Sequence, residues 1–364
     1  MPYIRIFFTK NTTYGHPLFE RHNLLNYLFF TSKEKEGFLP CSQNIQAGFT
    51  IGVIAAGMGL RYSTEKENEK MAYWYRPIVN SDLIGEKMTI QLPGFPGGKA
   101  EKCSIHYLTL GEGEPLLLVH SLGQSIYTWR HLMPLLAEQY NVIALDLVGS
   151  GFSGRPVSMN YSMDEMADTL IEFIDGLHLD HVHAVGASLG GMYLLRAMSR
   201  FPERFDKVTV LCPGGVTKQM PRKIRRMGAP FIGPFVREGY TKKDVKKVLQ
   251  QCYYDSTVLT KEVLDEYFET LDSYSSRQAL MYSIRNFDEE LVWDGLKKTD
   301  HPVFVLWGEE DRMQPFENLE KVRDALKKGE FFSVRNAGHF FQEEKAELLA
   351  DMVNKYILYG EDGL

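Results

Sequence analysis

A serine between two glycines is the first residue in this sequence that could do covalent chemistry. The stretch HAVGASLGGMYLLRAM, residues 183–198, places Ser188 between Gly186 and Gly190. The residues before the serine form an apolar run typical of a buried strand, and those after it have helical spacing. A strand-to-helix turn of the form Gly-x-Ser-x-Gly holds the serine Oγ out above a sheet, beside the positive end of the helix. Ser188 is therefore a candidate nucleophile.

A serine nucleophile needs a base, and the base needs an acid that orients it. Asp311 follows one late apolar run, in VLWGEEDRMQP, and His339 follows the last one, in VRNAGHFFQEE. Both are expected at the carboxyl ends of strands, where open α/β sheets gather the loops that handle ligands. The chain order Ser188, Asp311, His339 is the order expected of a relay in such a sheet. The predicted chemistry is acyl transfer to water through an acyl-enzyme.

The elements that must position these side chains alternate along the chain. Two runs, 87–92 and 102–111, are expected to form a hairpin. Further strands are expected at 115–120, 141–147, 181–187, 207–212, 302–308 and 330–337, and helices near 126–139, at 163–177, from Leu189, at 315–328 and from Gln342. The interior strands are continuous apolar runs, which suits a parallel sheet covered on both faces.

The alternation stops between residues 215 and 295, where the pattern is mostly helical. The expected fold class is therefore α/β, a doubly wound and mostly parallel β-sheet with a helical lid inserted after the sixth strand. The expected domains are an N-terminal extension at 1–80, a core in two parts at 81–214 and 296–364, and the lid at 215–295 between them.

With these features the sequence resembles the α/β-hydrolase superfamily, and within it the lidded, esterase-like members with a serine nucleophile. The resemblance covers about residues 86–360. It rests on Gly-x-Ser-x-Gly at 186–190, HSLGQS at 120–125, DLVGSGFS at 146–153, the acid Asp311 and the Gly-His at 338–339.

The resemblance narrows the roles of two residues. It implies that Asp311 is the acid, in preference to its neighbours Glu309 and Glu310, because the superfamily's Gly-x-x-Asp spacing from Gly308 selects it. Members with aspartate at the nucleophile position are dehalogenases and epoxide hydrolases. Ser188 therefore argues against both of those activities.

The resemblance also implies an oxyanion hole made of two backbone N–H groups, those of Leu122 and Leu189. The first lies in His-Ser-Leu-Gly, residues 120–123, where many members have His-Gly-x. Ser121 either adds a hydroxyl to the substrate site or caps the helix that follows.

No cofactor, catalytic metal or nucleic-acid partner is expected. GSGFSG, residues 149–154, matches a dinucleotide motif, but Pro156 separates its glycines from the helix that would have to meet the pyrophosphate. The His-x-His at 181–183 has no partner at metallohydrolase spacing, and the four cysteines form no Cys-x-x-Cys pair. The composition, 44% hydrophobic and 24% charged, is that of a soluble globular protein, and the net charge of −6 gives no basic field for nucleic acid.

The predicted lid is expected to select a small-molecule acyl substrate. It is rich in aromatic residues and methionine, which indicates a pocket for an acyl or aryl group, although such residues can also build the lid's own core. Candidate pocket residues are Phe231, Phe235 and Tyr254, with Ser121 from the core. Carboxylic esters are expected first, and thioesters, C–C bonds of diketones, amides and lactones stay open. A non-catalytic protein that binds a ligand or partner in the same cleft is the alternative of another class.

The N-terminal extension contains one apolar run, AGFTIGVIAAGMGL, residues 47–60. Its 14 residues are fewer than the roughly 20 that span a bilayer. It could be a buried or interfacial helix, a membrane anchor extended by its flanks, or a signal-like segment behind a misassigned start. The basic stretches 218–228 and 241–248 of the predicted lid suggest contact with an anionic lipid surface or with an acidic substrate, or else a solvated helix face. The dispersed cysteines favour a cytoplasmic location, with membrane association as the alternative.

Overall fold

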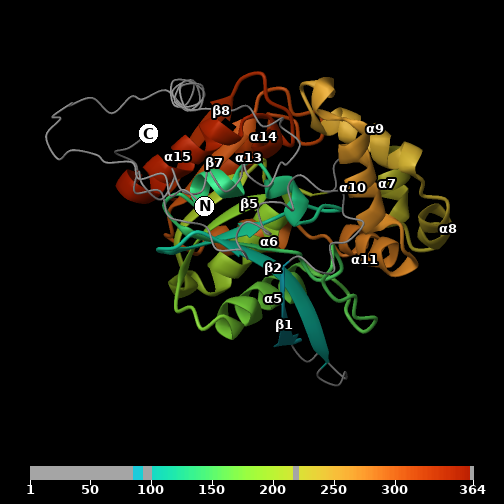
Figure 1. Ribbon diagram of the computed structural model, residues 1–364, viewed down its shortest axis with the longest axis horizontal. Helices are drawn as coiled ribbons and strands as arrows, with labels where there is room; N and C mark the ends of the chain where they lie inside the picture. The colour runs from blue at the N-terminus through green and yellow to red at the C-terminus, as the bar shows by residue number, and fades with distance from the viewer. Residues whose placement is uncertain (1–84, 93–100, 216–220, 361–364) are drawn as a thin grey trace, which may run out of the picture. The chain divides into compact units, whose positions relative to one another are not determined.

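The computed structural model describes residues 85–92, 101–215 and 221–360 (Figure 1). The predicted N-terminal extension, residues 1–80, and its apolar segment 47–60 lie outside these residues. Across the described parts of the chain, no helix is both long enough and apolar enough to cross a membrane.

The described residues form an eight-stranded sheet in the order β1-β2-β4-β3-β5-β6-β7-β8. The strands are β1 (Glu86–Gln91), β2 (Lys102–Leu110), β3 (Pro115–Val119), β4 (Asn141–Leu145), β5 (Val182–Ala187), β6 (Phe205–Leu211), β7 (Val303–Gly308) and β8 (Gly329–Val334). β2 pairs antiparallel with both β1 and β4, and every later pair is parallel. The predicted hairpin and the mostly parallel sheet are confirmed.

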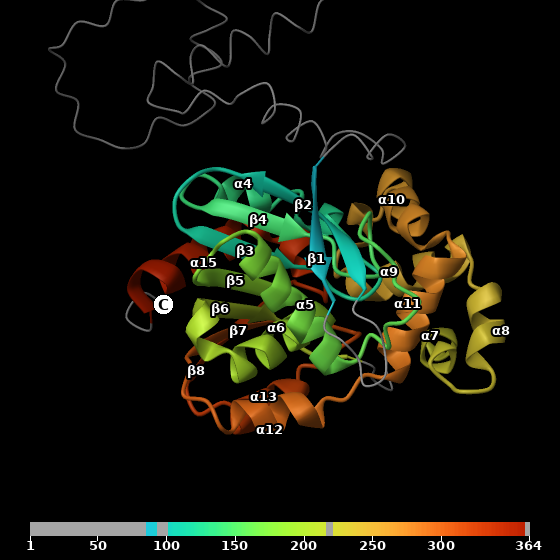
Figure 2. The ribbon, with the colours of Figure 1, turned by 90° about the horizontal axis from the view of Figure 1, so that it is seen from below.

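Helices cover both faces of the sheet because its central strands are apolar on both sides. β5 and β7 are buried along their whole length. The covering helices are α4 (Met133–Leu136), α5 (Met163–Gly176), α6 (Ser188–Arg200), α12 (Glu290–Leu296), α13 (Asn318–Ala325), α14 (Phe341–Glu344) and α15 (Ala346–Tyr359). α5, α6, α12 and α13 form one layer, and α15 packs with α4 on the other face (Figure 2).

The helix expected near 126–139 is broken into two short pieces. A 3-10 helix, η3 (Ile126–Trp129), starts after Ser125, whose side chain accepts a hydrogen bond from the N–H of Tyr127. α4 then begins with Pro134 in its first turn. Proline has no N–H to bond back to the preceding turn, so it starts a helix rather than continuing one.

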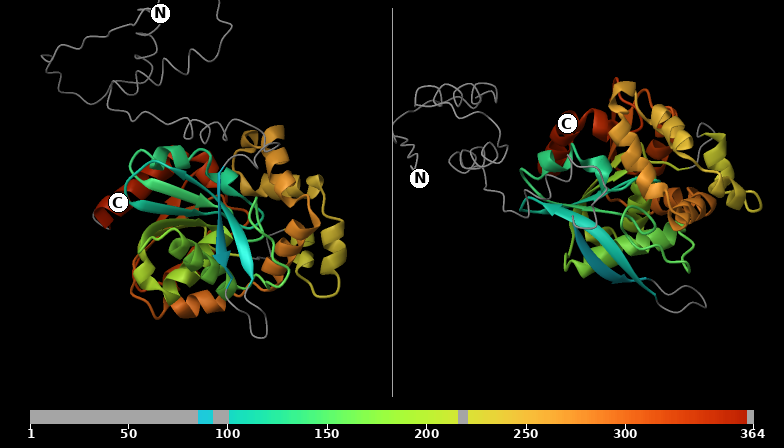
Figure 3. Two further views of the ribbon diagram at one scale, coloured as in Figure 1. Left: turned by 60° about the horizontal axis from the view of Figure 1, so that its bottom comes forward. Right: turned by 45° about the vertical axis from the view of Figure 1, so that its right-hand side comes forward.

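The chain between β6 and β7 is helical in its described part. It forms α7 (Arg222–Met227), α8 (Gly233–Glu238), α9 (Lys242–Cys252), the 3-10 helix η5 (Ser256–Val258), α10 (Lys261–Leu271), α11 (Tyr274–Arg285) and α12. α12 contributes its apolar residues to the core cluster of the sheet, whereas most apolar residues of α7–α11 form a second cluster. We term α7–α11 the helical insertion, and Figure 3 shows it grouped at one end of the sheet. It falls within the lid predicted at 215–295, and the predicted domain boundaries stay a prediction.

Candidate active site

Ser188 stands at the junction of β5 and α6, in the left-handed backbone conformation of a tight turn. Its φ is +49°, in the left-handed region that costs a non-glycine residue free energy. A Cβ at Gly190 would overlap the carbonyl oxygen of His120, and a Cβ at Gly186 would lie 2.7 Å from the Cα of Gly191. Both glycines are therefore required by the close approach of backbone to backbone at this turn.

The structure brings the three predicted relay residues together. His339 Nε2 lies 2.9 Å from Ser188 Oγ, and His339 Nδ1 lies 2.6 Å from Asp311 Oδ2. The other carboxylate oxygen, Oδ1, accepts hydrogen bonds from the backbone N–H groups of Met313 at 2.7 Å and Gln314 at 2.8 Å. All three relay side chains are buried. The carboxylate is thus held by the backbone and oriented so that His339 can accept a proton at Nε2.

The two other acidic residues of this loop have separate partners. Glu310 accepts a hydrogen bond from the backbone N–H of Ala337 at 3.0 Å, and Glu309 accepts one from the hydroxyl of Ser333 at 2.7 Å. These carboxylates join the loop after β7 to the end of β8 and the loop that follows it. Asp311 is the acid of the loop that bonds to His339.

The loop after β3 is fixed from two sides. His120 Nδ1 donates to the carbonyl of Ser121 at 2.8 Å, while its Nε2 accepts from the N–H of Leu147 at 3.0 Å. Burial lowers the pKa of His120, which matches a neutral ring with one donor and one acceptor. On the other side, Gln124 Oε1 accepts from the N–H of Ser121 at 2.9 Å. Gly123 turns the chain with a φ of +68°.

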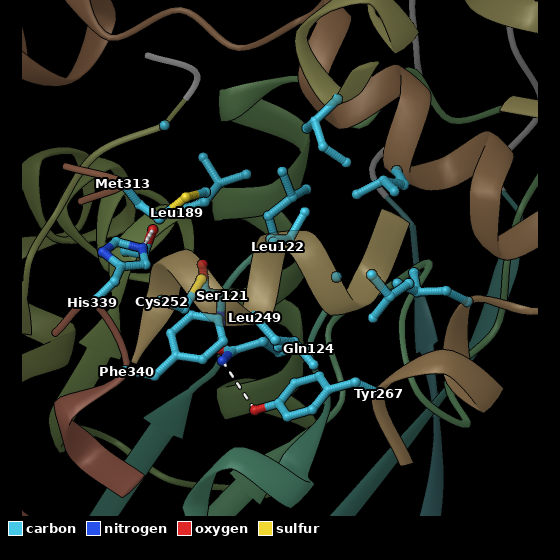
Figure 4. A pocket seen from close by; sticks show the side chains of 18 of the residues that line it. Ser121, Leu122, Gln124, Leu189, Leu249, Cys252, Tyr267, Met313, His339 and Phe340 are labelled. Atoms are coloured by element: carbon cyan, nitrogen blue, oxygen red, sulfur yellow. Dashed lines mark hydrogen bonds between the residues drawn. The ribbon is translucent and has the colours of Figure 1, made fainter. Parts of the chain in front are cut away.

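A cavity opens beside Ser188 and His339, between the core and the helical insertion (Figure 4). Leu122, Leu189 and Ser121 line it, so these three predicted residues lie beside the nucleophile. Its apolar wall includes Ile224, Val245 and Leu249 from the insertion and Leu189, Met313 and Phe340 from the core. None of the described residues that line it is Lys, Arg, Asp or Glu.

Three of the predicted pocket residues lie elsewhere, and the prediction was wrong for them. Phe231 and Phe235 are 89% and 79% exposed and Tyr254 is 43% exposed, and none of the three lines the cavity. The aromatic content of residues 215–295 indicated which part of the chain lines the cavity. It did not show which side chains point into the cavity. The alternative role of Ser121 as a helix cap is filled by Ser125, which caps η3.

A buried polar network joins the insertion to the core, and the sequence analysis did not find it. Glu343 of α14 pairs with Arg130 at 2.6 Å and accepts the hydroxyl hydrogen bonds of Tyr253, at 2.8 Å, and of Tyr267. The Tyr267 oxygen also accepts from Gln124 Nε2 at 3.3 Å (Figure 4). Burial raises the pKa of both tyrosines, so both remain donors at neutral pH. Two tyrosines of the insertion are thus attached to one core carboxylate, and one of them reaches the loop after β3.

Cys212 is a free, buried cysteine beside the relay. Its ligand atom and those of Asp311 and His339 lie within 4.8 Å of one another, a spacing that could hold a metal ion. Burial raises the pKa of the Cys212 thiol well above its usual value, and a protonated thiol is a poor metal ligand. The hydrogen bonds of Asp311 and His339 fit a proton relay better than a metal centre.

Comparisons with known proteins agree with this fold. The family model described as alpha/beta hydrolase fold matches residues 114–346. YugF, an uncharacterized hydrolase of Bacillus subtilis (strain 168), is 30% identical over 253 residues, which cover 69% of this chain and 92% of that protein. The 2-hydroxy-6-oxo-2,4-heptadienoate hydrolase of Pseudomonas putida is 25% identical over 264 residues, 68% of this chain and 90% of the other. A solved structure of a meta-cleavage product hydrolase from Pseudomonas fluorescens IP01 has a TM-score of 0.60 at 24% identity, over 73% of this chain and 95% of that one. This chain belongs to the α/β-hydrolase fold family.

Proposed function

We propose that this protein is a serine hydrolase that cleaves carboxylic esters through an acyl-enzyme. One observation carries the proposal. An unbroken hydrogen-bonded chain runs from Ser188 Oγ through His339 to Asp311, and it opens into an apolar cavity. A buried nucleophile, base and orienting acid in this order are the arrangement that acyl transfer requires.

The steps follow from the positions of these groups. Ser188 Oγ attacks the ester carbonyl while His339 Nε2 takes its proton, and Asp311 stabilises the imidazolium that forms. The backbone N–H groups of Leu122 and Leu189 donate to the developing oxyanion. Leu189 lies in the first turn of α6, where backbone N–H groups have no partner within the helix. His339 then protonates the leaving alcohol, and water releases the acyl group by the same route in reverse.

Hydrolysis of a C–C bond or of a thioester is the alternative with the same relay. Relatives named as dienoate hydrolases favour the C–C bond reaction. The cavity favours the ester, because a dienoate carries a carboxylate and a buried carboxylate needs a cation or several donors. None of the described lining residues is Lys or Arg. The donor groups of Gln124, Gln314 and Tyr267 already bond to other groups of the protein. A neutral acyl group is therefore the better match.

The experiment is turnover of a p-nitrophenyl ester series of increasing acyl length, with Ser188→Ala as the test variant. We expect Ser188→Ala to lower kcat by more than about 10³-fold, because the acyl-enzyme cannot form. Ser199→Ala is the matched control, since the Ser199 hydroxyl bonds within α6 to the carbonyl of Arg196. It is expected to leave turnover unchanged.

The outcomes separate the alternatives. Faster turnover of a 2-hydroxy-6-oxo-dienoate than of any ester would assign the C–C bond reaction. Labelling of Ser188 by a fluorophosphonate without ester turnover would point to a thioester or another narrow substrate. Neither turnover nor labelling in folded protein would favour the non-catalytic binding protein and contradict the proposal.

A further inference from the structure

The first part of the helical insertion is rich in basic residues. Residues 221–250 contain nine Lys or Arg and two Asp or Glu, in a chain whose net charge is −6. The exposed cations on α7 and α9 are Arg222, Arg225, Arg226, Lys243, Lys246 and Lys247. The two acids are already paired with other cations, Glu238 with Arg237 at 2.9 Å and Asp244 with Lys223 at 2.6 Å. Neither acid therefore pairs with Arg222, Arg226, Lys243, Lys246 or Lys247.

Between these two basic helices stands a cluster of exposed apolar side chains. Phe231 is 89% exposed, Phe235 is 79% exposed and Ile232 is 46% exposed. We term these three residues the exposed tip. The tip belongs to α8 and the turn before it, and α8 lies at the outer end of the insertion in two views at right angles (Figures 1 and 2). Three large apolar side chains held in water within five residues are costly, and such exposed residues mark a surface that meets another apolar phase.

The combination of apolar tip and flanking cations is complementary to an anionic lipid surface. Aromatic and aliphatic side chains enter the boundary between headgroups and acyl chains, while Lys and Arg remain at the level of the phosphates. The tip residues are exposed and line no described cavity, so they fit insertion into a soft phase better than the capture of a helix or peptide.

The same helices face the cavity on their other side. Ile224 of α7 and Val245, Val248 and Leu249 of α9 line the cavity, whereas Lys243, Lys246 and Lys247 of α9 are exposed. The charged side of α9 is therefore the reverse side of the cavity wall. A surface that meets lipid here would bring the cavity next to acyl chains.

We propose that the exposed tip and the cations of α7 and α9 dock this protein on anionic membranes, and that the substrate it takes there is a lipid ester. The choice of substrate rests on the proposed serine hydrolase activity, and the docking does not. Phe231 and Phe235, expected from the sequence to contact substrate, act in this proposal on the membrane.

The test is co-sedimentation of the full chain, as its Ser188→Ala variant, with vesicles of phosphatidylcholine alone or mixed with phosphatidylglycerol. The inactive variant removes hydrolysis from the measurement, so docking is tested even if the proposed activity is wrong. We expect binding to the mixed vesicles to weaken with added salt, because headgroup attraction is screened. Phe231→Ser with Phe235→Ser should weaken it by about tenfold or more.

A matched control separates a loss of docking from the general effect of removing exposed apolar side chains. Leu358 and Tyr359 of α15 are 56% and 64% exposed, so Leu358→Ser with Tyr359→Ser removes a similar pair away from the insertion. We expect these two changes to leave binding unaltered. Changing Lys243, Lys246 and Lys247 to Gln should weaken binding and flatten its dependence on salt.

Four results would overturn docking by the tip. These are no binding to mixed vesicles, equal binding to neutral vesicles, equal loss in the α15 control, and self-association in which a second copy covers the tip. Binding that survives both tip changes would place contact elsewhere in the chain. In active protein, the tip changes should slow release of a vesicle-borne ester but not of soluble p-nitrophenyl butyrate. Equal slowing of both would contradict the lipid-ester substrate alone.

Discussion

The α/β core and the helical insertion position their functional groups by different physical means. In the core, backbone geometry does so, since Ser188 is fixed by a left-handed turn and the Asp311 carboxylate by two backbone N–H groups. In the insertion, side chains on helix faces do so, through a smaller apolar cluster and through two tyrosine hydroxyls on Glu343. In the proposed function, the core holds the reacting groups and the insertion supplies part of the cavity wall.

The largest expected effect is at the backbone contact beneath the nucleophile. In Gly190→Ala the new Cβ would overlap the carbonyl oxygen of His120, and neither backbone segment can withdraw without moving the turn or the loop after β3. We expect turnover and fluorophosphonate labelling to fall by more than about 10³-fold. The control is Gly239→Ala at the end of α8, where the added Cβ would lie 3.6 Å from the carbonyl oxygen of Phe235, an ordinary contact. Labelling near the wild-type level in Gly190→Ala would show that close backbone packing does not hold the nucleophile in position here.

The next effect in size concerns the acid. Asp311→Asn keeps the shape of the side chain but no longer holds His339 in the tautomer that accepts the serine proton. We expect kcat to fall by roughly 10³ to 10⁴-fold, with little change in the thermal unfolding midpoint. Glu310→Gln should change kcat by less than about threefold, because Glu310 bonds to the backbone of Ala337 and not to His339. A larger loss in Glu310→Gln than in Asp311→Asn would reassign the acid.

The same contrast explains which features could be predicted from the sequence. The turn at Ser188 requires glycine on both sides. The five residues of the Gly-x-Ser-x-Gly pattern are therefore enough to predict its backbone geometry. Strand ends bring Asp311 and His339 to one edge of the sheet, so the alternating pattern placed both near Ser188. The superfamily's Gly-x-x-Asp spacing then selected Asp311 over Glu309 and Glu310. Both predictions concern backbone geometry, which the residue types and the alternating pattern of a single sequence indicate well.

The features that could not be predicted depend on side chains from distant segments. α8 has six residues, fewer than two turns, so its pattern does not show that Phe235 faces water. The contact between Gln124 and Tyr267 joins residues 143 positions apart and leaves no periodicity to detect. Pro134 was visible in the sequence, and its usual place at a helix start could have indicated the break between η3 and α4.

The smallest expected effect distinguishes Tyr253 from Tyr267, two tyrosines of the insertion that both donate a hydrogen bond to Glu343. Tyr253→Phe and Tyr267→Phe each remove one hydrogen bond to Glu343, so each should lower the free energy of unfolding by about 1–3 kcal/mol. Only Tyr267 also contacts Gln124, whose other end holds the N–H of Ser121. Urea unfolding and ester kinetics on both variants measure the two effects separately.

We expect the kinetics to show that one side chain of the insertion also acts on a loop of the core. Without the Tyr267 hydroxyl, Gln124 loses one of the groups that fix it, and the loop carrying Leu122 becomes less ordered beside the developing oxyanion. Such a change acts on the transition state more than on the bound ester, so we expect Tyr267→Phe to lower kcat by about fivefold to tenfold with KM nearly constant. Tyr253→Phe should leave kcat within about twofold. Equal losses of kcat would mean that attachment of the insertion matters only as a whole. Equal stability with unequal kcat would mean that one insertion side chain positions the core's oxyanion loop.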